Sequence, residues 1–264
     1  MNMYLHELKT YRKSIIIWSI CLVVYFLLSA NKLSALDSAG QDVNKLMEDM
    51  PRAIRAIMGG ELDISTTAGY YGVCFVYVVL MGGIHAALLG ANIIAKEEQE
   101  KTVEFLMVKP VSRTKILIGK LAASLTNMVI FNFVSFGIGI WFFKNYASST
   151  FSTGDLVMLH AGLFLTQLIF MAIGNAIAAI NKQSRSAGSL SISILLGTYF
   201  LSIIVALSDK IDFLKYFTPF KYFEVAPIVR GESWGIEYYI ISLFIIIGCI
   251  GCTFFFYQKR DLKI

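Results

Sequence analysis

The chain has 264 residues, of which 56% are hydrophobic and only 16% are charged, and its formal net charge is +5. Ordinary soluble domains are about 45–50% apolar and about 25% charged, so this composition excludes an ordinary soluble domain and indicates a protein embedded in a lipid bilayer. The positive charge follows membrane topology, as shown below, and nucleic acid is therefore not expected as a partner.

Six apolar stretches have the length, or nearly the length, of a membrane-spanning helix, which needs roughly 20 mostly apolar residues. They are apolar on every face and lack the alternation of barrel strands, so helices are predicted rather than a β-barrel. The predicted spans are residues 14–30, 69–94, 121–143, 156–180, 190–207 and 236–257. We expect one all-α integral membrane domain over residues 1–264.

Two amphipathic segments flank the first predicted span. In residues 1–13 the side chains that share one helical face are Tyr4, Leu5, Leu8 and Tyr11. This pattern predicts an interfacial helix on the inner leaflet, and it is compatible with a plain basic flank that orients the span. Residues 31–68 have a helical period interrupted at Pro51, which predicts two short helices on the outer surface.

Between the second and third spans, residues 95–120 hold ten charged side chains. Glu97 and Lys101 are four residues apart, in the order that stabilises a helix. We therefore expect the helix to continue past the membrane surface over residues 96–107. Pro110 then ends it, because proline cannot donate a backbone hydrogen bond and disfavours helix at the preceding residue.

A second helix is expected after this proline, with Ser112 as its N-cap. An apolar strip formed by Val103, Leu106 and Met107 accompanies four glutamates in the same loop. A solvated loop that merely orients the chain would explain the lysines and arginines, but neither the glutamates nor the strip. A small apolar patch rimmed by charges of both signs is typical of a protein-docking surface.

The segment before the sixth span, residues 208–235, contains Pro219 and Pro227 among many aromatic residues. Proline interrupts helices, and amphipathic aromatic rings favour the membrane–water interface. We expect a broken or re-entrant helical segment here, with its backbone polar groups covered by protein.

The distribution of Lys and Arg predicts the orientation of the spans. With both termini inside, the inner segments hold 14 of the 23 Lys and Arg residues but only 6 of the 18 Asp and Glu residues. This excess agrees with the rule that positive charge stays on the cytoplasmic side. The chain is therefore expected to be a multi-pass protein with cytoplasmic termini.

Motifs for chemistry are missing from the sequence. It contains no G-x-x-x-x-G-K-[ST] phosphate loop, no HExxH and no GxSxG. We therefore expect no catalytic residue, no metal site and no cofactor in this chain. The predicted spans are also nearly free of Asp, Glu, Lys and Arg, which usually mark ion or proton pathways, so ion-coupled transport is disfavoured.

The loop sequence "EKTVEFLMVKPVSR", followed by a basic residue and "GKL", resembles the loop after the second span in ABC-2-type transporter permeases. The residues that match the family's pattern are Glu98, Thr102, Glu104, Leu106, Pro110, Val111, Ser112 and Arg113. Lys101 stands where many members have glycine, so we expect continued helix there rather than a tight turn. Six spans, "PFKYF" and "YQKRDL" extend the resemblance over nearly the whole chain.

The resemblance implies a permease in a bacterial cytoplasmic membrane that pairs with a second, identical or different permease and with separate cytosolic ABC ATPase subunits. ATP and Mg²⁺ would bind in those ATPase subunits and not in this chain. The loop would carry a coupling helix seated in a groove of the ATPase. The implied coupling residues are Glu97, Glu98, Glu100, Thr102, Glu104, Leu106, Pro110, Ser112 and Arg113.

In this family the second and fifth spans tend to line the translocation path. Applied to this sequence, the resemblance gives the path candidates Phe75, Tyr77, His85, Ser191, Ser193, Thr198 and Ser202. An apolar path with a few hydroxyl groups and one histidine favours an amphipathic substrate, such as a peptide antibiotic, a drug or a lipid-linked molecule. Export rather than import is implied by the family resemblance alone. For His85, a structural hydrogen bond is the alternative to substrate contact.

Three other functions are compatible with parts of the sequence. A membrane scaffold or sensor could use the same loop to dock a partner that is not an ATPase. A secondary transporter or channel should show ionisable residues within the spans or inverted repeats, and neither is found. A membrane enzyme should show converging polar groups, which are missing as well.

Overall fold

The computed structural model describes residues 3–39, 51–57, 62–102, 111–146, 152–181 and 183–259. Within these ranges all regular elements are helices, and none is a strand. Six helices are long and apolar enough to cross a membrane, as predicted. They are α1 (Met3–Ala39), α4 (Thr67–Gln99), α6 (Arg113–Tyr146), α7 (Thr153–Ile180), α8 (Ala187–Leu207) and α10 (Ile236–Lys259).

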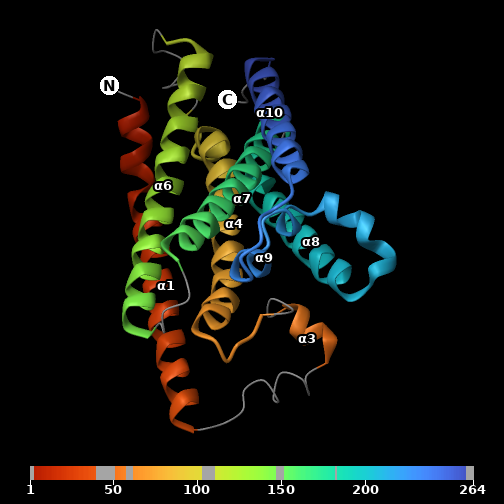
Figure 1. The fold of residues 1–264 in the computed structure, drawn as a ribbon. Coiled ribbons are helices and arrows are strands. Elements are labelled where there is room, and N and C mark those ends of the chain that lie inside the picture. Colours follow the sequence, from red (N-terminus) through yellow and green to blue (C-terminus); the bar gives the residue numbers. More distant parts are fainter. Residues whose placement is uncertain are drawn as a thin grey trace.

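Shorter helices lie between the long ones in the described residues (Figure 1). They are α3 (Arg52–Ile57), η1 (Ser184–Ser186), η2 (Asp209–Phe217), η3 (Pro219–Lys221) and α9 (Val225–Val229). The last three form the interrupted segment expected before the sixth span, and Pro219 begins η3. Of the two short helices expected in residues 31–68, the structure describes α3, directly after Pro51.

The centre of the bundle is built by α4 and α7. About two thirds of the most apolar part of α4 is buried inside the chain, against 11% for α10. Glycines let α4 and α7 approach closely: a Cβ on Gly174 would lie 2.5 Å from the backbone oxygen of Ala87. Small residues at helix contacts are the usual means of packing in lipid, where no hydrophobic effect drives helices together.

The peripheral helices leave apolar surface uncovered. In Figure 1, α1 and α6 run side by side along one edge of the bundle, while α8 and α10 lie at the other. On α10, Phe244 is 82% exposed, and Ile236 is 75% exposed. Such faces suit lipid or another membrane subunit.

The prediction of a separate interfacial helix over residues 1–13 needs correction, because α1 runs unbroken from Met3 to Ala39. No glycine or proline interrupts this stretch. Tyr4, Leu8 and Tyr11 pack against other helices, in the buried cluster that contains Ile93 and Tyr257. The Tyr4 hydroxyl lies 3.1 Å from Oγ1 of Thr126 in α6.

The start of α1 and the end of α10 lie at the same end of the bundle (Figure 1). There, Arg113 at the start of α6 donates a hydrogen bond from Nη1 to the backbone oxygen of Gln258 in α10, at 2.9 Å. At 33 residues, α4 is roughly 50 Å long, against about 30 Å for the hydrocarbon core of a bilayer. Part of α4 therefore projects beyond the membrane, next to the charged loop.

Candidate functional site

The second long helix ends in a left-handed turn at Lys101, whose φ angle is +56°. The Thr102 backbone N–H donates to the Glu97 backbone oxygen at 2.8 Å, and the Lys101 backbone N–H donates to the Glu98 backbone oxygen at 3.4 Å. These two bonds form a Schellman motif, which satisfies the last carbonyl groups of a helix. The prediction that this helix continues unbroken over residues 96–107 is therefore wrong at Lys101, because α4 stops at Gln99; residues 103–107 lie outside the described residues.

The expected pair of Glu97 with Lys101 is replaced by a different ion pair. The Glu97 carboxylate accepts a hydrogen bond from Lys120 Nζ in α6 at 2.5 Å. A helical pair four residues apart contributes only about 0.2–0.5 kcal/mol, so a partner on another helix easily outweighs it. Lys101 itself adopts the left-handed conformation that glycine favours. In the resemblance described above, it stands at the position where many members have glycine.

The start of α6 is capped as predicted. The Lys115 N–H donates to Oγ of Ser112 at 3.3 Å, and the Ile116 N–H donates to the Ser112 backbone oxygen at 3.1 Å. Next to it, the Arg113 guanidinium bonds to α10, and the Gln258 side-chain amide returns a bond to Oγ1 of Thr114 at 3.2 Å. Both ends of the loop are thus held by the bundle.

The predicted coupling residues fall into two groups. The described residues, Glu97, Glu98, Glu100, Thr102, Ser112 and Arg113, lie at the end of α4 and the start of α6. The others, Glu104, Leu106 and Pro110, lie outside the described residues, as do Val103 and Met107 of the apolar strip.

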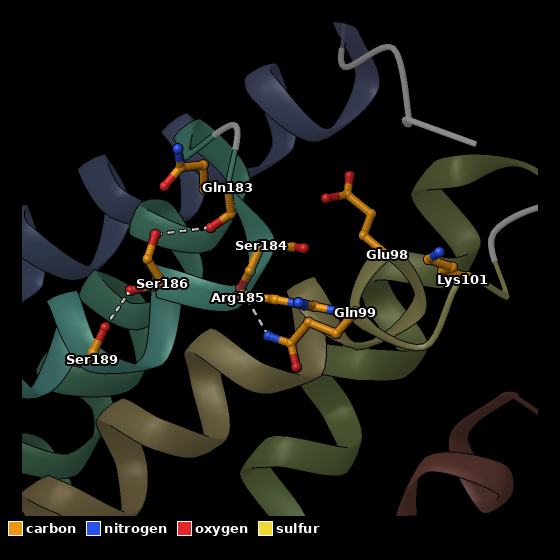
Figure 2. A pocket seen from close by; sticks show the side chains of 8 residues that line it. All are labelled: Glu98, Gln99, Lys101, Gln183, Ser184, Arg185, Ser186 and Ser189. Atoms are coloured by element: carbon orange, nitrogen blue, oxygen red, sulfur yellow. Dashed lines mark hydrogen bonds between the residues drawn. The ribbon is translucent and has the colours of Figure 1, made fainter.

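A polar pocket of about 550 Å³ opens beside the end of α4 (Figure 2). It is lined by Glu98, Gln99, Lys101, Gln183, Ser184, Arg185, Ser186 and Ser189. The Gln99 amide donates to the Ser184 backbone oxygen at 2.8 Å, and this bond joins α4 to the short loop before α8. The pocket thus extends the charged surface of the predicted docking loop onto a second loop, with Arg185 as its further cation.

A buried ionic cluster lies under this surface and was not expected from the sequence. Lys120 and Glu7 are both fully buried, with a relative exposure of 0%, and their nearest charged atoms are 3.8 Å apart. Lys96 lies 3.7 Å from the other Glu7 oxygen. From the sequence, Lys96 and Lys120 were counted only among the positive charges that orient the chain. Glu7, an acidic residue within a basic inner segment, is the feature of the sequence that could have indicated this cluster.

The predicted path residues do not gather on one surface. The Phe75 ring packs on His160 with a centroid distance of 4.9 Å, and the His85 ring lies 5.2 Å from that of Phe131. Phe75 and His85 are buried within this chain, Tyr77 is half-buried, and Ser193 is exposed.

The hydroxyl groups among the path candidates bond to their own helix. They donate to backbone oxygens three or four residues earlier in α8, as seen for Ser191 to Ala187, Ser193 to Ser189, Thr198 to Leu195 and Ser202 to Tyr199. In the described part of the chain, no three His, Cys, Asp or Glu side chains lie together as a metal site.

Six membrane-length helices and a charged, hydrogen-bonded end define a multi-pass membrane protein. Comparison with protein families identifies it further: the chain belongs to the ABC-2 family transporter proteins, whose family model matches residues 1–262. Members of this family are membrane permeases that lack catalytic sites, and the ATPase is a separate subunit.

A curated relative is the uncharacterized protein YhcI of Bacillus subtilis (strain 168). It is 23% identical over 208 residues, which cover 69% of this chain and 65% of the relative. The match thus spans slightly less than two thirds of the relative's length, and the name of the relative assigns no substrate.

Proposed function

We propose that this chain is the membrane subunit of an ATP-driven ABC exporter in the bacterial cytoplasmic membrane. The observation that carries the proposal is the anchored loop between α4 and α6. Its first end is fixed by the Schellman motif and the Glu97–Lys120 pair, and its second end by the Ser112 cap and the Arg113–Gln258 bond. A loop held at both ends can pass a displacement to the helices that hold it.

The loop and the neighbouring pocket together suit an ABC ATPase, the usual partner of ABC-2 permeases. In this proposal the ATPase binds ATP and Mg²⁺, and its closure moves the loop toward or away from the membrane. The positive charge of the segments predicted to lie inside supports a cytoplasmic position for this end, where α1 starts and α10 ends (Figure 1).

A second permease subunit is proposed because α8 presents a small-residue stripe at its surface. Ser189, Ser193 and Gly197 are exposed and spaced four residues apart, and a Cβ on Gly197 would meet no atom within 4 Å. Small residues at this spacing allow the backbones of two membrane helices to approach closely. The pathway would then form between the two subunits.

The proposed substrate is amphipathic. Charged side chains in the six long helices gather near their ends, so a path through their apolar middle offers a substrate hydroxyl groups and aromatic rings but few ions. Burying an unpaired charge in such a path is costly, which disfavours small ions as cargo.

The direct test is purification of the tagged chain from its own bacterium in mild detergent, followed by mass spectrometry and an ATP hydrolysis assay. We expect a stoichiometric ABC ATPase with vanadate-sensitive activity. Glu98→Ala combined with Glu104→Ala should weaken its binding at least about tenfold, because truncating charged interface groups costs about 2–5 kcal/mol.

Lys144→Ala is the matched control, because Lys144 is exposed at the opposite end of α6. It should leave the amount of bound ATPase unchanged. A stable permease that purifies without any ATPase would contradict the proposal and favour a scaffold or a secondary transporter.

A further inference from the structure

Four charged side chains from three helices meet in the interior at the loop end of the bundle. They are Glu7 of α1, Lys96 and Glu97 of α4, and Lys120 of α6. Lys120 is the centre of this cluster: its Nζ donates to the Glu97 carboxylate at 2.5 Å and also to the backbone oxygen of Ile93. Its side chain has no exposed surface.

Glu7 is the least satisfied member of the cluster. Its two carboxylate oxygens lie 3.8 Å from Lys120 Nζ and 3.7 Å from Lys96 Nζ, which is ion-pair distance but too long for a hydrogen bond. Both oxygens are buried, and within the described residues neither has a hydrogen-bond partner. Burying charges that are so loosely paired is costly, so general adhesion between helices does not explain the cluster.

A buried ionic cluster can define the register between helices better than apolar packing does. Here the register concerns the helices on either side of the loop. Glu97 is four residues before the Lys101 turn, and Lys120 lies in the third turn of α6. Tyr11 and Tyr257 pack in the same apolar cluster as Ile93, whose backbone oxygen accepts a hydrogen bond from Lys120.

We infer that Lys120 is a positioning residue for energy coupling: it joins the ends of α4 and α6, and through Glu7 the end of α1, into one unit that moves with the loop. This inference rests on the proposed function, because it needs a partner that moves the loop. Without Lys120 the partner would still dock and hydrolyse ATP, but loop movement would no longer reach the outer ends of the helices.

The test uses the permease–ATPase complex in proteoliposomes. Spin labels are placed on Asn145→Cys, at the far end of α6, and Ile236→Cys, at the start of α10, in a background without the native cysteines. Both positions are exposed. The distance between the labels is measured with and without ATP plus vanadate, alongside ATPase binding and ATP hydrolysis.

In the wild-type complex we expect a distance shift when ATP and vanadate are added. Lys120→Met should abolish this shift while ATPase binding stays within about twofold of wild type, a difference of about 0.4 kcal/mol. Lys120→Arg should restore it. Lys144→Met, the same substitution at an exposed position of the same helix, should leave the shift intact.

A merely structural role for Lys120 predicts a lower melting temperature with the shift preserved, and that result would overturn the inference. If Lys120→Met does not yield folded protein, the double variant Lys120→Met with Glu7→Gln decides, because the second substitution removes a buried charge that has lost its main cation. An unchanged shift in this double variant, or a wild-type complex that hydrolyses ATP without any shift, would overturn the inference too. Failure of the wild-type chain to bind an ATPase is distinguishable, because it contradicts the proposed function itself.

Discussion

The two ends of the helical bundle are held together by different forces. At the loop end, charges and hydrogen bonds join α1, α4, α6 and α10, as the Glu97–Lys120 and Arg113–Gln258 contacts show. At the other end, aromatic rings fasten the segment between α8 and α10: Phe223 packs on Trp234 with a centroid distance of 5.2 Å, and Tyr222 packs on Tyr238 at 5.6 Å.

This difference has a mechanical consequence. An ion pair in the interior fixes a distance between two atoms, so it transmits a displacement of one helix to the next. Ring packing depends on contact area and tolerates sliding, with about 0.5–1.5 kcal/mol per aromatic pair. The end that is proposed to receive the ATPase is therefore the rigid one, while the opposite end has contacts that can adjust to an opening path.

The aromatic end also contains directed bonds, and one of them reaches α8: Oγ1 of Thr218 donates to the Thr198 backbone oxygen at 2.8 Å. The Trp234 indole donates to the Glu224 backbone oxygen at 2.8 Å, and the Tyr222 hydroxyl donates to the Tyr216 oxygen at 2.5 Å. Burial raises the pKa of Tyr222 to about 12, so the phenol stays protonated as a donor at neutral pH. The Trp234 and Tyr222 bonds shape the segment itself, and its docking on the helices combines the Thr218 bond with ring contacts.

The largest expected effect comes from breaking the ionic end. Lys120→Met should destabilise the protein by about 3–5 kcal/mol, because it leaves the buried Glu7 and Glu97 without their main cation. Adding Glu7→Gln to this variant should recover part of the loss, about 1 kcal/mol or more, since the uncompensated charge is removed. Thermal unfolding in detergent, followed by fluorescence, measures both; strictly additive effects of the two substitutions would contradict the cluster.

A somewhat smaller effect is expected from breaking the aromatic end. Trp234→Ala should cost about 3 kcal/mol, because the ring is only 8% exposed and packs on Phe223 and Gly162. Trp141→Ala, at a ring that is 39% exposed, is the control and should cost less than about 1 kcal/mol. Equal losses of melting temperature in the two variants would show that the aromatic cluster does not fasten this segment.

Much of the fold could be predicted because hydropathy directly reflects burial in a bilayer. Each of the six predicted spans lies within one long helix, although the helices run further: the first was expected over residues 14–30, and α1 covers Met3–Ala39. The start of α3 after Pro51 and the break at Pro219 were also predictable, since proline acts through its own backbone.

The partners of the charged residues could not be predicted, because they depend on how the helices pack. Glu97 was assigned to Lys101 by its spacing in sequence, and only the approach of α6 brings Lys120 closer. The same limit applies to residues 1–13, because their amphipathic face suits an interfacial helix and a packed helix equally well. Only the contact with α6 in the folded chain distinguishes the two. The role of the coupling residues stays a prediction, because it belongs to a complex with another protein.

A smaller effect should follow from loosening the second end of the loop. Ser112→Ala removes the hydroxyl that accepts from the Lys115 N–H, and loss of such an N-cap costs about 1 kcal/mol. Ser112→Asp, which restores the acceptor and adds a negative charge at a helix N-terminus, should recover the loss. Hydrogen exchange at the first turn of α6 is the measurement; unchanged exchange in Ser112→Ala would show that the cap does not hold the loop.

The smallest predicted effect is a gain in stability at the turn that ends α4. A residue with a Cβ is strained by about 1–2 kcal/mol in the left-handed conformation, and Lys101 adopts it with φ at +56°. Lys101→Gly should therefore raise the free energy of unfolding by up to about 1 kcal/mol, while Lys101→Ala, which removes the same charge but keeps the strain, should not. If Lys101→Gly is more stable than wild type and Lys101→Ala is not, then the left-handed turn determines where α4 ends and the loop begins. The lysine charge would then have no part in it. Equal effects of the two substitutions would assign the position to electrostatics instead.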